Sequence, residues 1–214
     1  EKLFLVAPEP GLKLSYRQLK DGCIHFGHHM LKLGLEKGDK ISYMMGNGCQ
    51  TTRIFLGAMY SGFTIAPLNL LAQPSQLAYV LEHSDTKLIF FTEDQKEKLQ
   101  EAVSQINRRI ELFQIDNDSE SLFPDDADAG ASALPDVSEN DDALLLYTSG
   151  TTGLPKGAML THRNLLAMTM NFYADICPGF TSDDVILHAA PLSHGSGLYA
   201  LPNFGKGATN VILE

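Results

Sequence analysis

The sequence contains few cysteines, and the three that it has do not form a motif. Cys23, Cys49 and Cys177 lie far apart, with no Cys-x-x-Cys pair and no spacing typical of metal ligands. No internal repeat of solenoid length is present either. This pattern indicates reduced thiols in a cytoplasmic protein. It argues against a disulfide framework and against a structural zinc site.

Long apolar runs and targeting signals are also missing. No apolar stretch approaches the roughly 20 residues of a transmembrane helix, so we expect no transmembrane segment. The first ten residues, EKLFLVAPEP, lack the basic and then apolar pattern of a secretory signal. Because the chain begins without a Met, we expect it to be part of a longer protein.

Basic residues are absent from one long segment. The net charge is −10, and ten acidic residues lie from Asp116 to Asp142, where the sequence has no Lys, Arg or His. The net charge argues against nucleic acid as a partner. Because residues 116–142 also lack hydrophobic periodicity and contain Pro124 and Pro135, we expect an exposed acidic loop or linker outside the main sheet. An acidic docking tail is the alternative interpretation.

The rest of the chain has the composition and periodicity of a folded α/β protein. Hydrophobic residues make up 44% of the 214 residues, enough to bury a core. Residues 15–34 predict an amphipathic helix that begins at a capping box of Ser15 and Gln18 and ends at Gly34. Pro74 predicts the start of a later helix. Strand-like runs such as KISYMM, TIAPLN and KLIFFT alternate with helices, which indicates parallel-rich sheets covered by helices.

The most informative stretch is YTSGTTGLPKG, residues 147–157. Glycine lets backbone N–H groups approach an anion, hydroxyls add donors, and a lysine adds positive charge. The residues that we predict to hold a polyphosphate are Thr148, Ser149, Gly150, Thr151, Thr152, Gly153 and Lys156. The stretch is not a Walker A motif, which needs Gly before its Lys and Ser or Thr after it. The alternative is a flexible surface turn between two strands.

This stretch resembles the phosphate-binding signature of the adenylate-forming superfamily, which includes acyl-CoA synthetases, luciferases and the adenylation domains of peptide synthetases. The resemblance extends over nearly the whole chain, through LGLEKGDKISYMMGNG, FLGAMYSGFTIAPLN, LAYVLEHSDTKLIFF and APLSHGSGLYALP in the expected order. It implies the partial N-terminal domain of such an enzyme. We expect an N-terminal α/β region at 1–115, the acidic loop at 116–142, and the phosphate-loop region with following βα units at 143–214.

The resemblance also implies a chemistry. Members join a carboxylic acid to ATP, release pyrophosphate, and pass the acyl group to a thiol such as coenzyme A. Negative charge develops on the leaving pyrophosphate, so positioned donors and Mg²⁺ stabilise the transition state. Residues Thr148 to Thr152 with Lys156 are expected to hold the β- and γ-phosphates beside Mg²⁺.

The segment PLSHGSG resembles the part of the family that borders the acyl pocket. This likeness places His194 at the substrate and lets Gly195 and Gly197 leave room for it. Ser193 stands where an aromatic residue is common, so the shape of the pocket differs from the usual pattern. A structural histidine at a helix start is the alternative for His194. We expect His188 to lie on a core strand without a functional role, and the catalytic residues stay unassigned.

We therefore predict the N-terminal fragment of an ATP-dependent acyl-CoA ligase that activates a carboxylic acid of the fatty type. The chain ends at Glu214, before the family's adenine-binding segment, ribose-binding Asp and C-terminal lysine, so the fragment alone is expected to be inactive. Two alternatives stay open. One is an adenylation domain that loads a carrier protein, and the other is a short non-catalytic module of the same fold. The oligomeric state is open as well.

Overall fold

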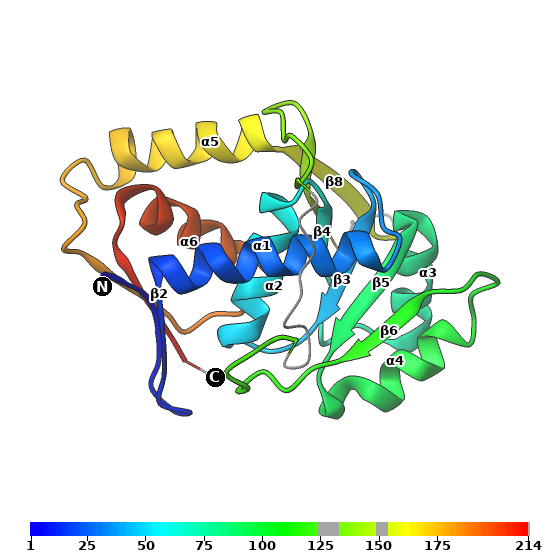
Figure 1. Ribbon diagram of the computed structural model, residues 1–214. Coiled ribbons are helices and arrows are strands. Elements are labelled where there is room, and N and C mark those ends of the chain that lie inside the picture. Colours follow the sequence, from blue (N-terminus) through cyan, green and yellow to red (C-terminus); the bar gives the residue numbers. More distant parts are fainter. Residues whose placement is uncertain (124–132, 149–153, 214) are drawn as a thin grey trace.

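The computed structural model describes residues 1–123, 133–148 and 154–213, and these form two β-sheets covered by helices (Figure 1). The six-stranded sheet has the order β6 (Glu111–Gln114), β5 (Thr86–Phe91), β3 (Lys40–Met44), β4 (Thr64–Pro67), β7 (Asp142–Thr148) and β8 (Lys156–Thr161). The four-stranded sheet has the order β2 (Leu12–Ser15), β1 (Leu3–Ala7), β10 (Thr209–Ile212) and β9 (Val185–His188).

Helices connect most of these strands, as the alternating pattern predicts. They are α1 (Tyr16–Lys32), α2 (Cys49–Tyr60), α3 (Pro74–Ser84), the short turn η1 (Glu93–Gln95), α4 (Lys96–Val103), α5 (His162–Asn171), the π-helical turn η2 (Phe172–Ile176) and α6 (Gly195–Lys206). Among the described strand pairs, only β1–β2 and β7–β8 are antiparallel. The predicted α/β class with parallel-rich sheets is confirmed.

Local sequence signals set several of these helix ends. At the start of α1, the Ser15 hydroxyl accepts from the Gln18 backbone N–H at 3.2 Å, and the Gln18 side chain accepts from the Ser15 N–H at 2.8 Å. Gly34 follows α1 with φ +86°, a left-handed conformation that glycine adopts without strain. Pro74 is the first residue of α3.

The central strands of the six-stranded sheet are buried on both faces, and β5 shows how its sequence allows this. Leu88 and Phe90 belong to the hydrophobic core that also contains side chains of α1 and α2. Ile89 and Phe91 belong to a second core with side chains of α3 and α4. Alternate residues of a strand point to opposite faces, so a continuous apolar run can fill both cores. Figure 1 shows α1 lying across the sheet.

The four-stranded sheet joins the two ends of the chain. Strand β1 pairs in parallel with β10, with Leu5 opposite Asn210. The Asn210 side chain also donates to the backbone carbonyl of Phe4 at 3.2 Å. The sequence pattern predicts no strand in the first fifteen residues. Strand β1 pairs with β2 within this segment, but its other edge pairs with β10 about 200 positions away, which local patterns do not reveal.

The acidic segment is not a solvated linker throughout. Residues 124–132 lie outside the described part. Before them, the Asn117 side chain donates to the carbonyl of Asn47 at 2.7 Å, and the Phe123 ring stacks on His29 at 3.8 Å. Phe123 is half-buried and packs against the main core. The expectation of an exposed loop is therefore wrong at Phe123, because this side chain packs against α1 and the main core.

Across the part of the chain that the structure describes, no helix is both long and apolar enough to cross a membrane.

Candidate active site

The predicted phosphate-binding signature belongs to the β7–β8 hairpin. In its antiparallel register, Tyr147 lies opposite Gly157 and Thr148 lies opposite Lys156. Thr148 and Lys156 are both exposed. The five residues between these strands that we predict to bind phosphate (Ser149, Gly150, Thr151, Thr152 and Gly153) lie outside the described residues. The hairpin therefore places the hydroxyl of Thr148 and the ammonium of Lys156 on the two strands of one stem.

A hollow of about 480 Å³ adjoins this stem. Thr148 and Pro155 line one side of the hollow, and Ser193, His194 and Gly195 line another. Nearly 40 residues or more separate the two groups in sequence. The fold thus brings Thr148 of the predicted phosphate residues and His194 and Gly195 of the predicted acyl residues to one cavity at the carboxyl end of β7, where α/β sheets commonly bind ligands.

The other walls of the hollow are mainly apolar. They come from the end of β4 and the segment after it, from α3, from β7 and from α6. The apolar residues among them are Pro67, Leu68, Ala72, Leu77, Val80, Leu146 and Leu198. Asn69 and Gln76 add two amide side chains. Such a lining fits a molecule with an apolar part and a polar head group.

His194 lies at the residue that precedes α6. Its backbone is extended, its side chain makes no capping hydrogen bond, and its Nδ1 lies 3.2 Å from the Ser193 hydroxyl. The His194 side chain is exposed and lines the hollow, whereas Ser193 is buried. His194 thus lies where a molecule in the hollow could contact it, and its role at the acid stays a prediction.

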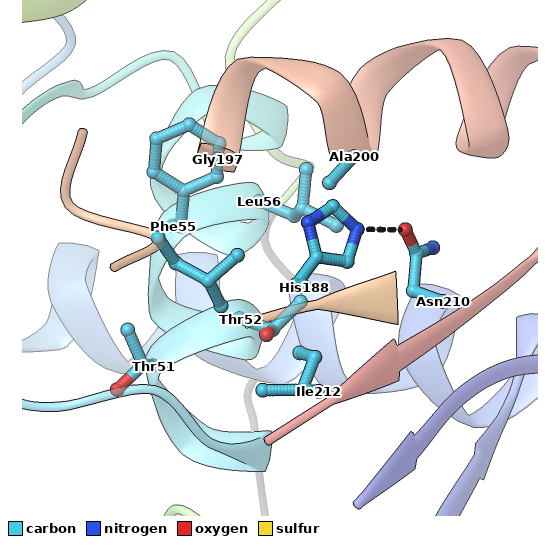
Figure 2. Close-up of a pocket in the computed structure, with 10 residues that line it drawn as sticks. Thr51, Thr52, Phe55, Leu56, His188, Gly197, Ala200, Asn210 and Ile212 are labelled. Carbon is cyan, nitrogen blue, oxygen red and sulfur yellow. Dashed lines mark hydrogen bonds between the residues drawn. The ribbon is translucent and has the colours of Figure 1, made fainter. Parts of the chain in front are cut away.

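The two glycines after His194 differ in their surroundings. A Cβ atom on Gly195 would meet nothing within 4 Å, and Gly195 lines the hollow. A Cβ atom on Gly197 would come to 2.1 Å from the backbone oxygen of Leu192. Gly197 lines a separate small cavity (Figure 2). Its small size lets α6 approach the Leu192 backbone, so it does not widen the hollow as we expected.

His188 is the central side chain of that second cavity (Figure 2). It is 1% exposed on β9, in agreement with the expected core position. Its Nε2 lies 2.8 Å from the Asn210 side-chain oxygen, and its Nδ1 lies 3.0 Å from the Ser196 hydroxyl. Burial lowers the pKa of His188, while the bonds to Asn210 and Ser196 oppose this shift. The neutral ring thus ties the first turn of α6 to the four-stranded sheet.

Asn47 holds the segment before His194 and was missed in the sequence. Its side-chain nitrogen donates to the carbonyls of Ala190 at 3.2 Å and Leu213 at 3.0 Å. Its side-chain oxygen accepts from the Leu192 N–H at 2.8 Å. Between two glycines, Asn47 gave only the signal of a turn. Its partners are more than 140 residues away, so no local pattern could have identified this role.

Tyr147 and His83 form a second contact that the sequence did not reveal. The Tyr147 hydroxyl lies 2.7 Å from His83 Nδ1, and Tyr147 lines the hollow beside Thr148. Burial raises the pKa of Tyr147 to about 12, and the neighbouring Tyr79 adds to the shift. Tyr147 is therefore protonated near neutral pH, and its hydroxyl shares a hydrogen bond with His83 Nδ1 in which the tautomer of the ring decides the donor.

The described residues contain no group of three or more His, Cys, Asp or Glu side chains that could hold a metal ion. The described side chains that line the hollow supply three hydroxyls, two amides and one histidine, and Lys156 lies opposite Thr148 in the hairpin. This donor set suits an anionic ligand better than a bare cation, because an ammonium group repels cations and carboxylates are lacking.

Comparison with known proteins identifies the family of the chain. The chain matches the family model of AMP-binding enzymes over residues 1–214, and it belongs to that family. Among curated proteins it is similar to the sulfoacetate–CoA ligase of Cupriavidus necator, with 39% identity over 200 residues that cover 92% of this chain and 39% of the relative. It is also similar to the medium-chain fatty-acid–CoA ligase of Escherichia coli, with 29% identity over 98% of this chain and 39% of the relative.

The solved structure of ATP-bound MatB from Rhodopseudomonas palustris has the same fold over this region. Its TM-score is 0.81 at 27% identity, covering 100% of this chain and 42% of that chain. The chain thus spans about two fifths of the length of the relatives described here. The fold also matches the N-terminal domain of FACL13 from Mycobacterium tuberculosis, with a TM-score of 0.85 at 22% identity over 99% of this chain and 53% of that chain.

Proposed function

We propose that the whole protein is an ATP-dependent acyl-CoA ligase, which converts a carboxylic acid to an acyl-adenylate and transfers the acyl group to coenzyme A. The observation that carries this proposal is the shared hollow. We call the paired strands β7 and β8 the phosphate stem. The hollow places Thr148 of this stem and His194 of the predicted acyl segment on the walls of one cavity. Family membership and the similarity to two CoA ligases support the reaction type.

In this proposal, the phosphate stem stabilises the leaving pyrophosphate. The carboxylate of the acid attacks the α-phosphorus of ATP, and the bond from phosphorus to the pyrophosphate oxygen breaks. Lys156 and Thr148 flank the signature residues 149–153, whose hydroxyls and backbone N–H groups are the proposed donors to the β- and γ-phosphates. Charge on the leaving group rises during the step, so these donors act more strongly in the transition state than before it.

Mg²⁺ fits this arrangement as an ion that arrives with the nucleotide. Mg²⁺ keeps several waters and is commonly bound by substrate phosphates with one or two protein oxygens. The hydroxyl groups of Thr148 and of the signature are oxygen donors of this kind. Bound there, the ion would neutralise part of the charge on the phosphates.

The acid is proposed to lie against the apolar walls, with His194 and Gly195 at its side. The apolar lining from Leu77, Val80 and Leu198 supports an acid with a hydrocarbon portion, such as a fatty acid. The two curated relatives act on sulfoacetate and on medium-chain fatty acids, as their names state. Because both are CoA ligases, they support coenzyme A as the thiol rather than a carrier protein. Three free thiols support a cytoplasmic location.

Acid-dependent exchange of labelled pyrophosphate into ATP by the whole protein tests this function. Exchange should appear only when a suitable carboxylic acid is present, because the acyl-adenylate must form and then revert. A panel of short, medium-chain and aromatic acids, followed by a search for acyl-CoA after addition of coenzyme A, identifies the substrate and the thiol acceptor. Absence of exchange with every acid would refute the proposal and favour a binding module.

A further inference from the structure

The phosphate stem extends beyond its support in the sheet. Strand β8 lies at the edge of the six-stranded sheet, and β7 is registered with β4 at the pair Leu144 and Ile65. From Leu145 to Thr148, the pairing of β7 runs along β8. The outer half of the hairpin, which ends in Thr148 and Lys156, therefore needs a different attachment to the body of the protein.

Helix α3 supplies that attachment through His83. The His83 ring meets the Tyr147 ring edge to face, with centroids 5.8 Å apart and planes at 85°, and Nδ1 lies 2.7 Å from the hydroxyl. Tyr79, one turn earlier on α3, stacks on His83 with centroids 5.5 Å apart. Among the described residues, this is the side-chain hydrogen bond that joins the outer half of the hairpin to another element.

The Tyr147 ring also contacts the opposite strand of the hairpin. A Cβ atom on Gly157 would come to 3.2 Å from Cζ of Tyr147 and 3.0 Å from a methyl carbon of Leu145. Gly157 is therefore small because the Tyr147 ring lies over it. One tyrosine thus connects α3, β7 and β8, and its neighbours in the register are Thr148 and Lys156.

We propose that His83 is a positioning residue for pyrophosphate release, which acts through Tyr147 to hold the phosphate stem against α3. The inference rests on the proposed ligase function. Without the hydrogen bond, the stem keeps its strand pairing and the core contacts of Leu145 and Leu146, but its outer end loses its side-chain hydrogen bond to α3. Lys156 and Thr148 then reach the leaving phosphates in only a fraction of molecules, which weakens the first half-reaction.

Three substitutions separate the hydrogen bond from the rings. Tyr147→Phe removes the hydroxyl and keeps the ring over Gly157. His83→Leu removes the hydrogen-bond partner of Tyr147, while His83→Asn places an amide, which can donate or accept, close to the position of Nδ1 and can restore the bond. His25→Leu is the matched control, because His25 is an exposed histidine of α1 that does not line the hollow.

The first measurement is hydrogen–deuterium exchange of peptides from β7 and β8 without nucleotide. Exchange should rise in Tyr147→Phe and His83→Leu, and return towards the wild-type rate in His83→Asn. The double variant of Tyr147→Phe and His83→Leu should resemble either single variant, because both remove one bond. Unchanged exchange in His83→Leu, or fully additive increases in the double variant, would overturn the inference.

The second measurement is the pyrophosphate exchange reaction of the whole protein. The loss of one net hydrogen bond predicts a roughly two- to tenfold rise in KM for pyrophosphate in Tyr147→Phe and His83→Leu. His83→Asn should recover most of the loss, and transfer from a preformed acyl-adenylate to coenzyme A should be unchanged. Equal losses in both half-reactions would indicate general damage and contradict the inference. If the wild-type protein shows no acid-dependent exchange, the ligase proposal fails, and deuterium exchange still decides whether His83 holds the stem.

Discussion

The two sides of the hollow are anchored in different ways. On the His194 side, the Asn47 side chain makes three hydrogen bonds. Gly197 packs closely against Leu192, and the buried His188 lies 3.0 Å from the Ser196 hydroxyl. The phosphate side is joined to its neighbouring helix by the bond of Tyr147, within the residues that the structure describes. In the proposed function, the more extensively bonded side selects the acid, and the stem, which also packs Leu145 and Leu146 into the core, holds the leaving group.

The largest expected effect concerns the His194 side of the hollow, called the fixed side below. Gly197→Ala should destabilise the protein by about 3 kcal/mol or more, because the added methyl group would overlap the Leu192 carbonyl and force the backbone apart. Gly195→Ala is the matched control and should change stability by less than about 1 kcal/mol, since its Cβ meets open space. Chemical denaturation of both variants measures the difference. Equal stabilities would show that α6 is not anchored at Leu192.

His194 tests whether the fixed side selects the acid. His194→Ala should change the ratio of kcat/KM between short and long acids by about tenfold, while KM for ATP changes little, because one side chain of a pocket is altered. His25→Ala serves as the control, since this exposed histidine lies outside the hollow. An equal loss for every acid, together with a lower melting temperature, would favour a structural role for His194.

The smallest expected effect concerns the pH dependence of protein stability, to which His188 on the fixed side contributes. The folded-state pKa of His188 lies below its ordinary value of 6.5, so the unfolded chain binds a proton more readily than the folded protein. The stability that His188 contributes is complete above about pH 6.5 and is lost as the pH falls towards the folded-state pKa. His188→Gln keeps a donor for Asn210 but does not titrate.

Thermal melts at about pH 7.5 and about pH 5.5 measure this effect. Wild-type protein should lose more stability between these pH values than His188→Gln. The pKa of His162 is also lowered, mainly by burial, but both proteins retain His162, so its effect cancels in the comparison. Equal losses in the two proteins would show that His188 does not contribute to the pH dependence.

Local features of the fold were predictable from the sequence, whereas long-range contacts were not. The capping box at Ser15, the helix start at Pro74 and the strand alternation depend on residues within a few positions of one another. The Asn47 bonds to Ala190 and Leu192, by contrast, join segments that only the folded chain brings together.

The candidate site shows the same division. The signature could be predicted because its glycines, hydroxyls and lysine all lie in one short stretch from Thr148 to Lys156. Gly197 was assigned to the pocket because it follows His194 closely in sequence, but the turn of α6 directs it towards Leu192. His83 gave no signal, since a lone histidine on a helix is more commonly a solvated residue and its partner Tyr147 lies 64 positions away.

Single-turnover kinetics of the two half-reactions in Lys156→Ala test the central claim most directly, namely that the stem holds the leaving pyrophosphate. Loss of one positioned donor predicts roughly 100- to 1,000-fold slower formation of acyl-adenylate. Transfer from a preformed acyl-adenylate to coenzyme A should be nearly unchanged, because no pyrophosphate remains. Lys20→Ala, on the exposed face of α1, should leave both rates unchanged. Equal slowing of the two half-reactions in Lys156→Ala would contradict the account.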